Sequence, residues 1–347
     1  MPTFEAQQLT PFVQHIFEGH GVRRAVARQV ARSLVLSNLK GHDSHGVFRV
    51  IQYVDWLSRG WIDPEAELEV LRDDGAILMT DGHYGFGQYV GRQATRAAID
   101  KTGQQGVCIL TLRRGGHLGR IGEFAELAAA AGLVHFSLAN VHGGGVLVAP
   151  HGGRERRLSA NPLTAAAPLA GGEAIVMDMA TSTIAEGKLN VARARGEEVA
   201  PGLFLNGEGL PSTRPEEFYG DPPGALLPMA GHKGFALSVF AEILAGALAG
   251  GSCSRWGQPR VANNWFALFV DPKRFSGQES FAGECSRFRD WVKSSRLQDG
   301  FSEILMPGEP EARMWEQRSR QGIPVEEDTW RKIAAISSAV GVPLPPA

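Results

Sequence analysis

Hydrophobic residues recur at helical spacing near both ends of the chain. Residues 4–37 predict two amphipathic helices separated near "GHGV" (19–22). Residues 47–64 predict a third helix, which Gly60 and Pro64 end. From about residue 280 the pattern returns to helices, in "FRDWVKSSR", "EARMWEQRSRQG" and "EEDTWRKIAAISSAVG". Helices at both termini therefore frame the rest of the chain.

Short apolar runs of strand length dominate the middle of the chain, namely "AILMTDG", "VCILTLR", "VHFSLANV", "AIVMDMA" and "WFALFVDP". Helical patterns separate the first three of these runs. Residues 234–250 predict a buried helix rather than a membrane span, because Glu242 lies in the middle and a carboxylate is costly in hydrocarbon. The alternation predicts an α/β fold with a tendency toward α+β.

Two units follow from this pattern. The helical ends predict one domain built from both termini, residues 1–75 with 276–347. Residues 76–275 predict an α/β domain. Its stretch 141–232 is dense in glycine and proline, which indicates long functional loops between strand-like pieces.

Composition narrows the classes of partner. Hydrophobic residues make up 43% of the chain and charged residues 21%, as in an ordinary globular protein. The 35 basic and 37 acidic residues balance, so we expect neither nucleic acid nor an anionic membrane as a partner. Three distant cysteines argue against a disulfide framework or a structural zinc site. Without a signal-peptide pattern, the composition predicts a cytoplasmic protein.

The motif "GFGQYVG" (85–91) follows a strand and precedes a helix, as a dinucleotide-binding turn would. Its spacing departs from G-x-G-x-x-G, and no acidic residue ends a strand some 20 residues later. We therefore do not expect a Rossmann fingerprint here.

Two other segments predict anion cradles at helix starts. In "EAIVMDMATSTIAEGK" (173–188) a strand leads to Asp178, then to small hydroxyl residues, then to a helix with Lys188. In "PMAGHKGFALSVF" (228–240) glycines bracket His232 and Lys233. Backbone N–H groups at helix starts favour phosphate. The alternative is that the hydroxyl residues only cap a helix and Lys233 is solvated.

The segment "GHDSHGVFR" (41–49) combines a possible proton donor with an anion anchor. If the helix begins by His45, then His45 and Arg49 share a face at i, i+4 spacing. An imidazole can act as a general acid, and a guanidinium can hold a carboxylate with two hydrogen bonds. This pair suits reduction of a 2-oxo acid. Alternatively, Asp43 and Ser44 cap the helix, or His42, Asp43 and His45 bind a metal with a further ligand.

A second candidate histidine lies in "RRGGHLGRIGEF" (113–124). His117 follows a strand within a glycine-rich turn, where a ligand can approach the backbone closely. Three arginines nearby favour an acidic ligand, and the alternative is a surface residue.

In this order, "DSHGVFR", "GGHLGRIGEFAELAAAAGL", "ANPLTAAAP", "IVMDMATSTIAEGK", "PMAGHKGFALSVFAEILAGAL" and "MPGEPE" resemble the type-2 malate/L-lactate dehydrogenase family. The resemblance covers most of residues 10–330. It implies a nicotinamide-dependent oxidoreductase, usually a homodimer, with a cofactor domain that is not Rossmann. Residues 76–275 would then be the cofactor-binding domain.

The resemblance also implies roles for individual residues. His45 matches a proton donor in some members, and His117 matches the acid/base of others. Ser44 and Arg49 match positions on the substrate side. We expect the cofactor along Asp178, Met179, Ala180, Thr181, His232, Lys233, Gly234, Pro307, Gly308 and Glu309, and we expect no metal.

Several points stay open in the sequence. Many members have "GTNP" where this chain has "SANP" (159–162), and loop 139–153 is rich in glycine, so the substrate is not defined. "RARGEEV" (193–199) carries arginine and acidic side chains, which suit NADP and NAD respectively.

The expected reaction is hydride transfer at C2 of a small 2-hydroxy or 2-oxo acid. The alternatives are a reductase of a cyclic imino acid and a dinucleotide-binding sensor without catalysis. A serine hydrolase using Ser44 and His45 is disfavoured, because adjacent helical residues do not face each other and no G-x-S-x-G motif is present.

Overall fold

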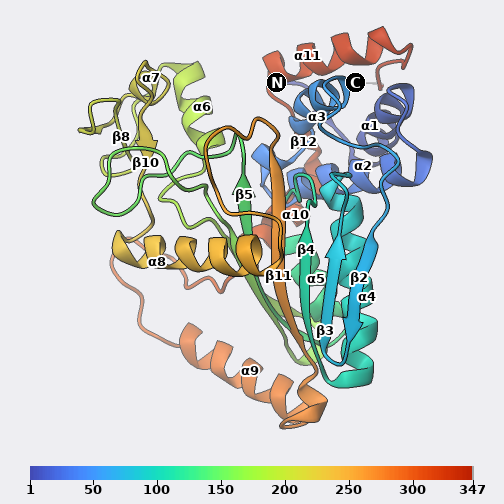
Figure 1. The fold of residues 1–347 in the computed structure, drawn as a ribbon. Coiled ribbons are helices and arrows are strands. Elements are labelled where there is room, and N and C mark those ends of the chain that lie inside the picture. The colour runs from blue at the N-terminus through green and yellow to red at the C-terminus, as the bar shows by residue number, and fades with distance from the viewer. Residues whose placement is uncertain (346–347) are drawn as a thin grey trace.

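A seven-stranded mixed sheet forms the centre of the molecule in a computed structural model that describes residues 1–345 (Figure 1). Its strands are β2 (Glu69–Asp74), β3 (Ile77–Asp81), β4 (Val107–Arg113), β5 (Val134–His142), β6 (Leu163–Pro168), β7 (Ala174–Met179) and β11 (Ala262–Val270). They lie in the order β2-β3-β4-β11-β5-β6-β7. Among the described residues only β3 and β4 run parallel within this sheet; its other neighbours are antiparallel. The α/β class is confirmed, and this strand order is not that of a Rossmann fold.

Helices cover the two faces of the sheet unequally. α4 (Gly87–Gln105) and α5 (Gly122–Ala130) pack behind it, and α8 (His232–Ala241) crosses in front with the π-helical turn η3 (Glu242–Leu248) (Figure 1). Alternate strand residues such as Leu110, Trp265 and Phe269 point toward α4 and α5 and are fully buried, because successive side chains in a strand face opposite sides.

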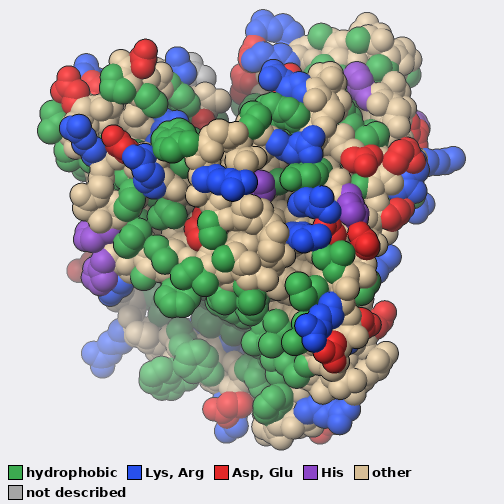
Figure 2. All heavy atoms as spheres, viewed as in Figure 1, with side chains coloured by type: hydrophobic (Ala, Val, Ile, Leu, Met, Phe, Trp, Pro, Cys, Tyr) green, Lys and Arg blue, Asp and Glu red, His purple; other side chains and the backbone are tan. Residues whose placement is uncertain are grey.

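The front face of the sheet stays partly uncovered. Ile109 and Phe136 are each 36% exposed on it, and Phe240 on α8 is 58% exposed. Figure 2, seen from the same side, shows hydrophobic side chains gathered over and below the region that α8 crosses. Apolar surface of this extent marks a contact region rather than an ordinary solvated face.

The helical part of the chain has its own core, to which both ends contribute. Phe17, Leu34 and Tyr53 pack with Ile323 and Ile333 from near the C-terminus. β1 (Thr3–Phe4) pairs with β12 (Ile323–Pro324), so the two ends of the chain lie together. The boundaries of the two domains, 1–75 with 276–347 and 76–275, stay a prediction. The helices of this part are α1 (Ala6–Gly19), α2 (Arg24–Leu39), α3 (Arg49–Ser58), α10 (Glu309–Gln321) and α11 (Glu327–Ala339). α9 (Gln278–Lys293) lies apart from them, at the far end of the sheet against β6 (Figure 1).

A small lobe stands beside the sheet. It contains α6 (Glu186–Arg195), α7 (Pro215–Phe218) and a three-stranded sheet of β8 (Phe204–Leu205), β9 (Pro211–Ser212) and β10 (Ala225–Leu226). Leu189, Phe204 and Phe218 are fully buried in its core. The sequence predicted this stretch only as loops interrupted by strand-like pieces, because strands of two residues are too short to show a periodic pattern.

The sequence pattern missed two strands of the main sheet. Every residue of β2, "EVLRDD", is exposed, so this charged edge strand lacks the apolar run that marks a buried strand. β6, "LTAAAP", is rich in alanine, which favours strands weakly. Its antiparallel pairing with β5 and β7 decides its conformation instead. No helix within residues 1–345 has both the length and the apolarity to cross a bilayer.

His135 on β5 is buried in the core with neither ring nitrogen bonded to a described residue, and its ring packs against Phe269 at 4.6 Å. Burial lowers its pKa from 6.5 to about 3. The unfolded chain therefore binds a proton that the folded chain does not, and stability falls as pH drops from 6.5 toward 3. We expect His135→Phe to stabilise the protein, by about 1 kcal/mol at pH 7 and by about 2 kcal/mol more at pH 5.

Urea unfolding at the two pH values tests this expectation, with exposed His15→Phe as the matched control. The control should leave the pH dependence of the unfolding free energy unchanged. Destabilisation by His135→Phe at both pH values would contradict it.

Candidate active site

The structure brings the two candidate histidines together. His45 ends a short 3₁₀ turn (Asp43–His45), and His117 follows β4 in its glycine-rich loop. Their rings are stacked, with centroids 5.5 Å apart and an angle of 14° between planes. Both side chains are half-buried. Segments 72 residues apart thus place two imidazoles in one site.

α3 begins at Arg49, not at His45 as the i, i+4 argument supposed. The 3₁₀ turn before it places the Ser44 hydroxyl 3.1 Å from His45 Nδ1. The expectation that these adjacent side chains cannot face each other is therefore wrong, since it assumed α-helical geometry. Asp43 binds Arg318 and Asn38. No group of three or more potential metal ligands occurs in the described part of the chain.

Arg49 at the start of α3 has part of its guanidinium available for a ligand. Its Nε donates to the carbonyl oxygen of Ser44 at 2.6 Å, and Nη1 donates to Gln52 Oε1. Nη2 donates to none of the residues that the structure describes. Burial lowers the pKa of Arg49, while the charges of Tyr53 and Glu186 oppose the shift. The guanidinium remains a cation at neutral pH.

Tyr53 and Gln88 hold the His117 ring at Nδ1. Gln88 Nε2 donates to the Tyr53 hydroxyl at 2.6 Å, and that hydroxyl lies 2.6 Å from His117 Nδ1. This leaves Nε2 as the ring nitrogen of His117 without a hydrogen-bond partner among the described residues. Burial raises the pKa of Tyr53 to about 12. Sequence reasoning missed both residues, although Tyr53 lies one helical turn after Arg49.

Two close backbone contacts explain why "GFGQYVG" is rich in glycine, without any bound phosphate. A Cβ on Gly87 would lie 2.3 Å from the carbonyl oxygen of His117, and a Cβ on Gly116 would lie 2.1 Å from the carbonyl oxygen of Gly85. Gly116 also has φ +60°. Glycine is needed because the two backbones touch directly. This contact holds the His117 loop against the start of α4.

Both imidazoles are neutral at physiological pH. Burial lowers the pKa of His45 from 6.5 to about 3, and the charges of Arg49, His42 and Arg120 act in the same direction. Burial, and then the charge of Arg49, hold the pKa of His117 well below 6.5. An anion bound to Arg49 would offset part of this lowering of the two histidine pKa values, because the positive charge of Arg49 is one of its causes.

A cavity of about 180 Å³ brings Asp178 at the end of β7 close to Gly308 at the start of α10. Arg120 is 3% exposed beside it and donates to both oxygens of Glu126, at 3.0 and 2.8 Å. Arg120 Nε is buried without a partner among the described residues. An unused cationic donor in a cavity fits an anionic or polar ligand group. The cavity is lined by Lys40, Arg120, Glu126, Ala174, Val176, Asp178, Gly308, Glu311 and Ala312.

The Pro307–Gly308 turn is attached directly to β7. Val176 N donates to Pro307 O at 3.0 Å, and a Cβ on Gly308 would lie 3.2 Å from Val176 N. Asp178 Oδ2 accepts from Gly122 N at 2.9 Å, and burial raises the pKa of Asp178. Glu309 turns away from this cavity and binds Lys293 at 2.6 Å.

The predicted anion cradle after Asp178 is not formed. Met179 is the last residue of β7, and Ala180 leads to Thr181, whose amide and hydroxyl both donate to Ala160 O at 2.9 Å. α6 begins only at Glu186, so these hydroxyl residues do not lie at a helix start. Their N–H groups are used within the protein instead.

The second predicted anion cradle, around His232 and Lys233, does lie at the start of a helix. α8 begins at His232 after Gly231, which has φ 62°. Gly234 is buried, and its Cβ position lies 2.8 Å from Thr181 O. His232 and Lys233 are exposed beside this contact. The α8 start and Thr181 therefore form one continuous surface.

A buried carboxylate holds this region in place. Glu242 in η3 accepts from Asn140 Nδ2 and Asn161 Nδ2, both at 2.8 Å, and from Ser254 Oγ at 2.6 Å. Asn161 belongs to the "SANP" segment, which adjoins Thr181 through Ala160. The sequence showed Glu242 only as an acidic residue in an apolar helix, because its partners come from distant segments.

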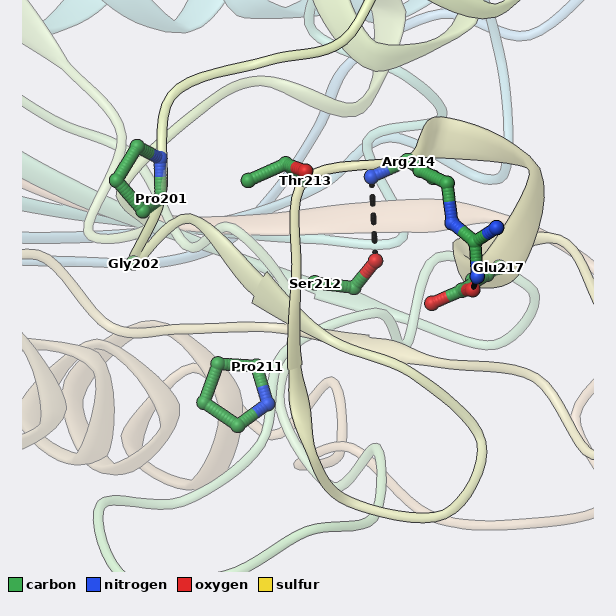
Figure 3. A pocket seen from close by; sticks show the side chains of 7 residues that line it. All are labelled: Pro201, Gly202, Pro211, Ser212, Thr213, Arg214 and Glu217. Atoms are coloured by element: carbon green, nitrogen blue, oxygen red, sulfur yellow. Dashed lines mark hydrogen bonds and ion pairs between the residues drawn. The ribbon is translucent and has the colours of Figure 1, made fainter.

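A hollow of about 310 Å³ in the small lobe has different chemistry (Figure 3). Its charged residues Arg214 and Glu217 pair with each other, and Arg214 N donates to Ser212 Oγ at 3.1 Å. It contains neither a histidine nor an unpaired cation. Its lining is Pro201, Gly202, Pro211, Ser212, Thr213, Arg214 and Glu217.

The mixed sheet, the histidine pair and the adjacent arginine are the parts of an oxidoreductase of small acids, and comparison with known proteins agrees. The sequence pattern of malate/L-lactate dehydrogenases matches residues 4–334, and the chain belongs to this family. It is therefore a 2-hydroxy acid oxidoreductase.

Individual relatives span several substrates. The chain is 38% identical to an L-lactate dehydrogenase of Cupriavidus necator, over 93% of each protein. It is 34% identical to a Δ1-pyrroline-2-carboxylate/Δ1-piperideine-2-carboxylate reductase of Pseudomonas putida, over 92% of each. The solved malate dehydrogenase of Pyrococcus horikoshii superposes with a TM-score of 0.89 at 32% identity, covering 99% of this chain and 96% of the other.

Proposed function

We propose that this protein catalyses reversible hydride transfer between NAD or NADP and C2 of a small 2-hydroxy or 2-oxo acid. The observation that carries the proposal is the stacked pair His45 and His117 beside Arg49, whose Nη2 has no described partner. The cavity that suits a polar ligand is lined by Arg120, whose charge is near enough to His45 to act on the pKa of that ring. Family membership supports a nicotinamide cofactor.

Arg49 would hold the substrate carboxylate. The hydrogen bond from its Nε to the Ser44 carbonyl oxygen fixes the orientation of the guanidinium. Nη2 is therefore already positioned for the substrate carboxylate before the substrate binds. The Ser44 hydroxyl, 3.1 Å from His45 Nδ1, would orient that ring and the substrate oxygen. The protein contributes placement and charge stabilisation.

His117 would transfer the proton. In the reductive direction hydride adds to C2, the carbonyl π electrons move to oxygen, and that oxygen takes a proton from Nε2 of the His117 imidazolium, which becomes the neutral ring. In the oxidative direction Nε2 of the neutral ring takes the hydroxyl proton, while the Tyr53 hydroxyl occupies Nδ1 and holds the ring in place. His45 lies alongside and would stabilise the charge that develops on oxygen.

The dinucleotide would extend from Lys233 and Thr181 along Asp178 to the Pro307–Gly308 turn. Arg120 Nε and the tight turn at Gly308 fit such a ligand. When bound, the nicotinamide supplies or accepts the hydride. The residues of this chain hold it, exclude water and manage the proton.

The lowered pKa values of the two histidines predict the pH dependence of hydroxy acid oxidation. Oxidation needs a neutral imidazole, and a lowered pKa keeps that form populated to lower pH. We expect kcat/KM for oxidation to stay constant from about pH 8 to 6 and to fall only in more acid solution. A pH–rate profile checks this, and a midpoint at 6.5 or above would contradict it.

A panel of 2-oxo acids and cyclic imino acids, followed at the nicotinamide absorbance with NADH and with NADPH, tests the proposed function. Turnover of keto acids supports it. Preference for piperideine- or pyrroline-2-carboxylate would favour the second candidate, which the Pseudomonas putida relative supports. Cofactor binding without turnover would indicate a sensor.

We also infer that two copies of the chain associate. The partly uncovered sheet face and the exposed side chains of α8 offer the apolar surface for a homodimer. Sedimentation equilibrium measures the mass, and a monomer at micromolar concentration would overturn this inference.

A further inference from the structure

The start of α6 places an acidic side chain beside the substrate anchor. A Cβ on Gly187 would lie 3.0 Å from Ser44 Cβ, so the Gly187 backbone packs closely against the Ser44 side chain. The carbonyl oxygen of Ser44 in turn accepts from Arg49 Nε. Glu186, half-buried and directly before Gly187, therefore borders the site that Arg49 serves.

Glu186 has no ion-pair partner among the described residues. Its Oε1 accepts from the Tyr219 hydroxyl at 2.6 Å, which leaves Oε2 unused. Arg156 is close, but its guanidinium donates to the carbonyl oxygens of Gly224 and Phe218, at 2.5 and 3.0 Å, and lies over the Phe218 ring. It is thereby held in the lobe. The negative charge on Glu186 is not neutralised by direct contact.

The charge of Glu186 reaches the substrate anchor. It opposes the lowering of the pKa of Arg49 by burial. Glu186 also occupies the first turn of a helix, where negative charge is favourable. The site therefore combines Arg49, whose Nη2 has no partner among the described residues, with a carboxylate that forms no direct ion pair among them.

This combination of Arg49 and Glu186 would distinguish substrates by their net charge. Arg49 would balance the single carboxylate of a 2-oxo acid, and both terminal nitrogens of Arg120 are already used by Glu126. A second anionic group would enter the field of Glu186 and be repelled by it. Charges that are partly shielded from water repel by more than exposed ones do.

We propose that Glu186 is a specificity-determining residue that restricts this enzyme to monoanionic 2-oxo acids and discriminates against dicarboxylates. The inference rests on the proposed function, because it requires a 2-oxo acid at Arg49. It names the substrate class that the family resemblance left open. Tyr219 holds the carboxylate in place, and Gly187 allows its close approach to Ser44.

The test compares kcat/KM for pyruvate, a monoanion, with kcat/KM for oxaloacetate, a dianion. The wild-type enzyme should prefer pyruvate, and Glu186→Gln should shift the ratio toward oxaloacetate by about tenfold. Glu198→Gln removes the same charge from an exposed position in the same lobe and should leave the ratio unchanged. Tyr219→Phe keeps the charge and should shift the ratio less than Glu186→Gln.

Salt separates an electrostatic effect from a structural one. Raising ionic strength should reduce the pyruvate preference of the wild type and should hardly affect that of Glu186→Gln. An unchanged ratio in Glu186→Gln, or a wild-type preference for oxaloacetate, would overturn the inference while leaving the proposed function intact. If no 2-oxo acid is reduced with either cofactor, the proposed function and this inference both fail.

Discussion

Replacement of His117 by alanine should slow hydride transfer by about 10²–10⁴-fold, the usual contribution of a general acid. Its Nδ1 is held by the Tyr53 hydroxyl at 2.6 Å, so Nε2 is the nitrogen left to exchange a proton with the substrate. His45 Nδ1 has a longer contact, 3.1 Å to the Ser44 hydroxyl, and His45→Ala should lose about tenfold, the cost of a supporting polar contact. Single-turnover measurements at the nicotinamide absorbance separate this step from product release.

Tyr53→Phe provides the matched variant. It removes only the hydroxyl that holds His117 at Nδ1, so we expect a loss between those of the two alanine variants. A larger loss in His45→Ala than in His117→Ala would reverse the assignment of the proton donor. If both alanine variants transfer hydride at nearly the wild-type rate, neither ring takes part.

Replacement of Arg49 by glutamine should weaken substrate binding by about 10²–10³-fold. Two charge-assisted hydrogen bonds to a carboxylate contribute about 3–4 kcal/mol, and each 1.4 kcal/mol is about tenfold in affinity. The effect should appear in KM for the keto acid, with the affinity for the cofactor unchanged. Arg49→Lys keeps the charge but loses the planar guanidinium, and its KM should lie between those of the wild type and Arg49→Gln.

Arg59→Gln is the control for this prediction. Arg59 follows the same helix and pairs with Asp55 at 2.8 Å on the surface, so its loss should leave KM unchanged. Tighter cofactor binding or an unaltered KM in Arg49→Gln would place the substrate carboxylate elsewhere. Dissociation constants for the reduced cofactor come from its fluorescence.

Elements with a strong local pattern could be predicted from the sequence. β4 was placed at its observed bounds, 107–113, because five of its seven residues are apolar and three of the seven are β-branched. α1 and α2 follow their amphipathic spacing and are separated at "GHGV". β2 and β6 could not be found in this way, since four of the six residues of β2 are charged and half of β6 is alanine.

The candidate site shows the same division. His45, Ser44 and Arg49 lie within one short segment, so their proximity is a local property. Tyr53, Gln88 and Glu242 were missed because their importance depends on partners far along the chain. The anion cradle expected after Asp178 was wrong for a related reason, since Ala160 takes the N–H and hydroxyl of Thr181.

The sequence by itself determined the α/β class, the family and the residues able to carry proton transfer and anion binding, because side-chain chemistry and short-range periodicity are written in local order. Tertiary structure decided that the two histidine rings stack, which hydrogen bonds are already used, and that the start of α6 lies against Ser44. These depend on distances between segments brought together by folding. Local spacing contains no measure of such distances.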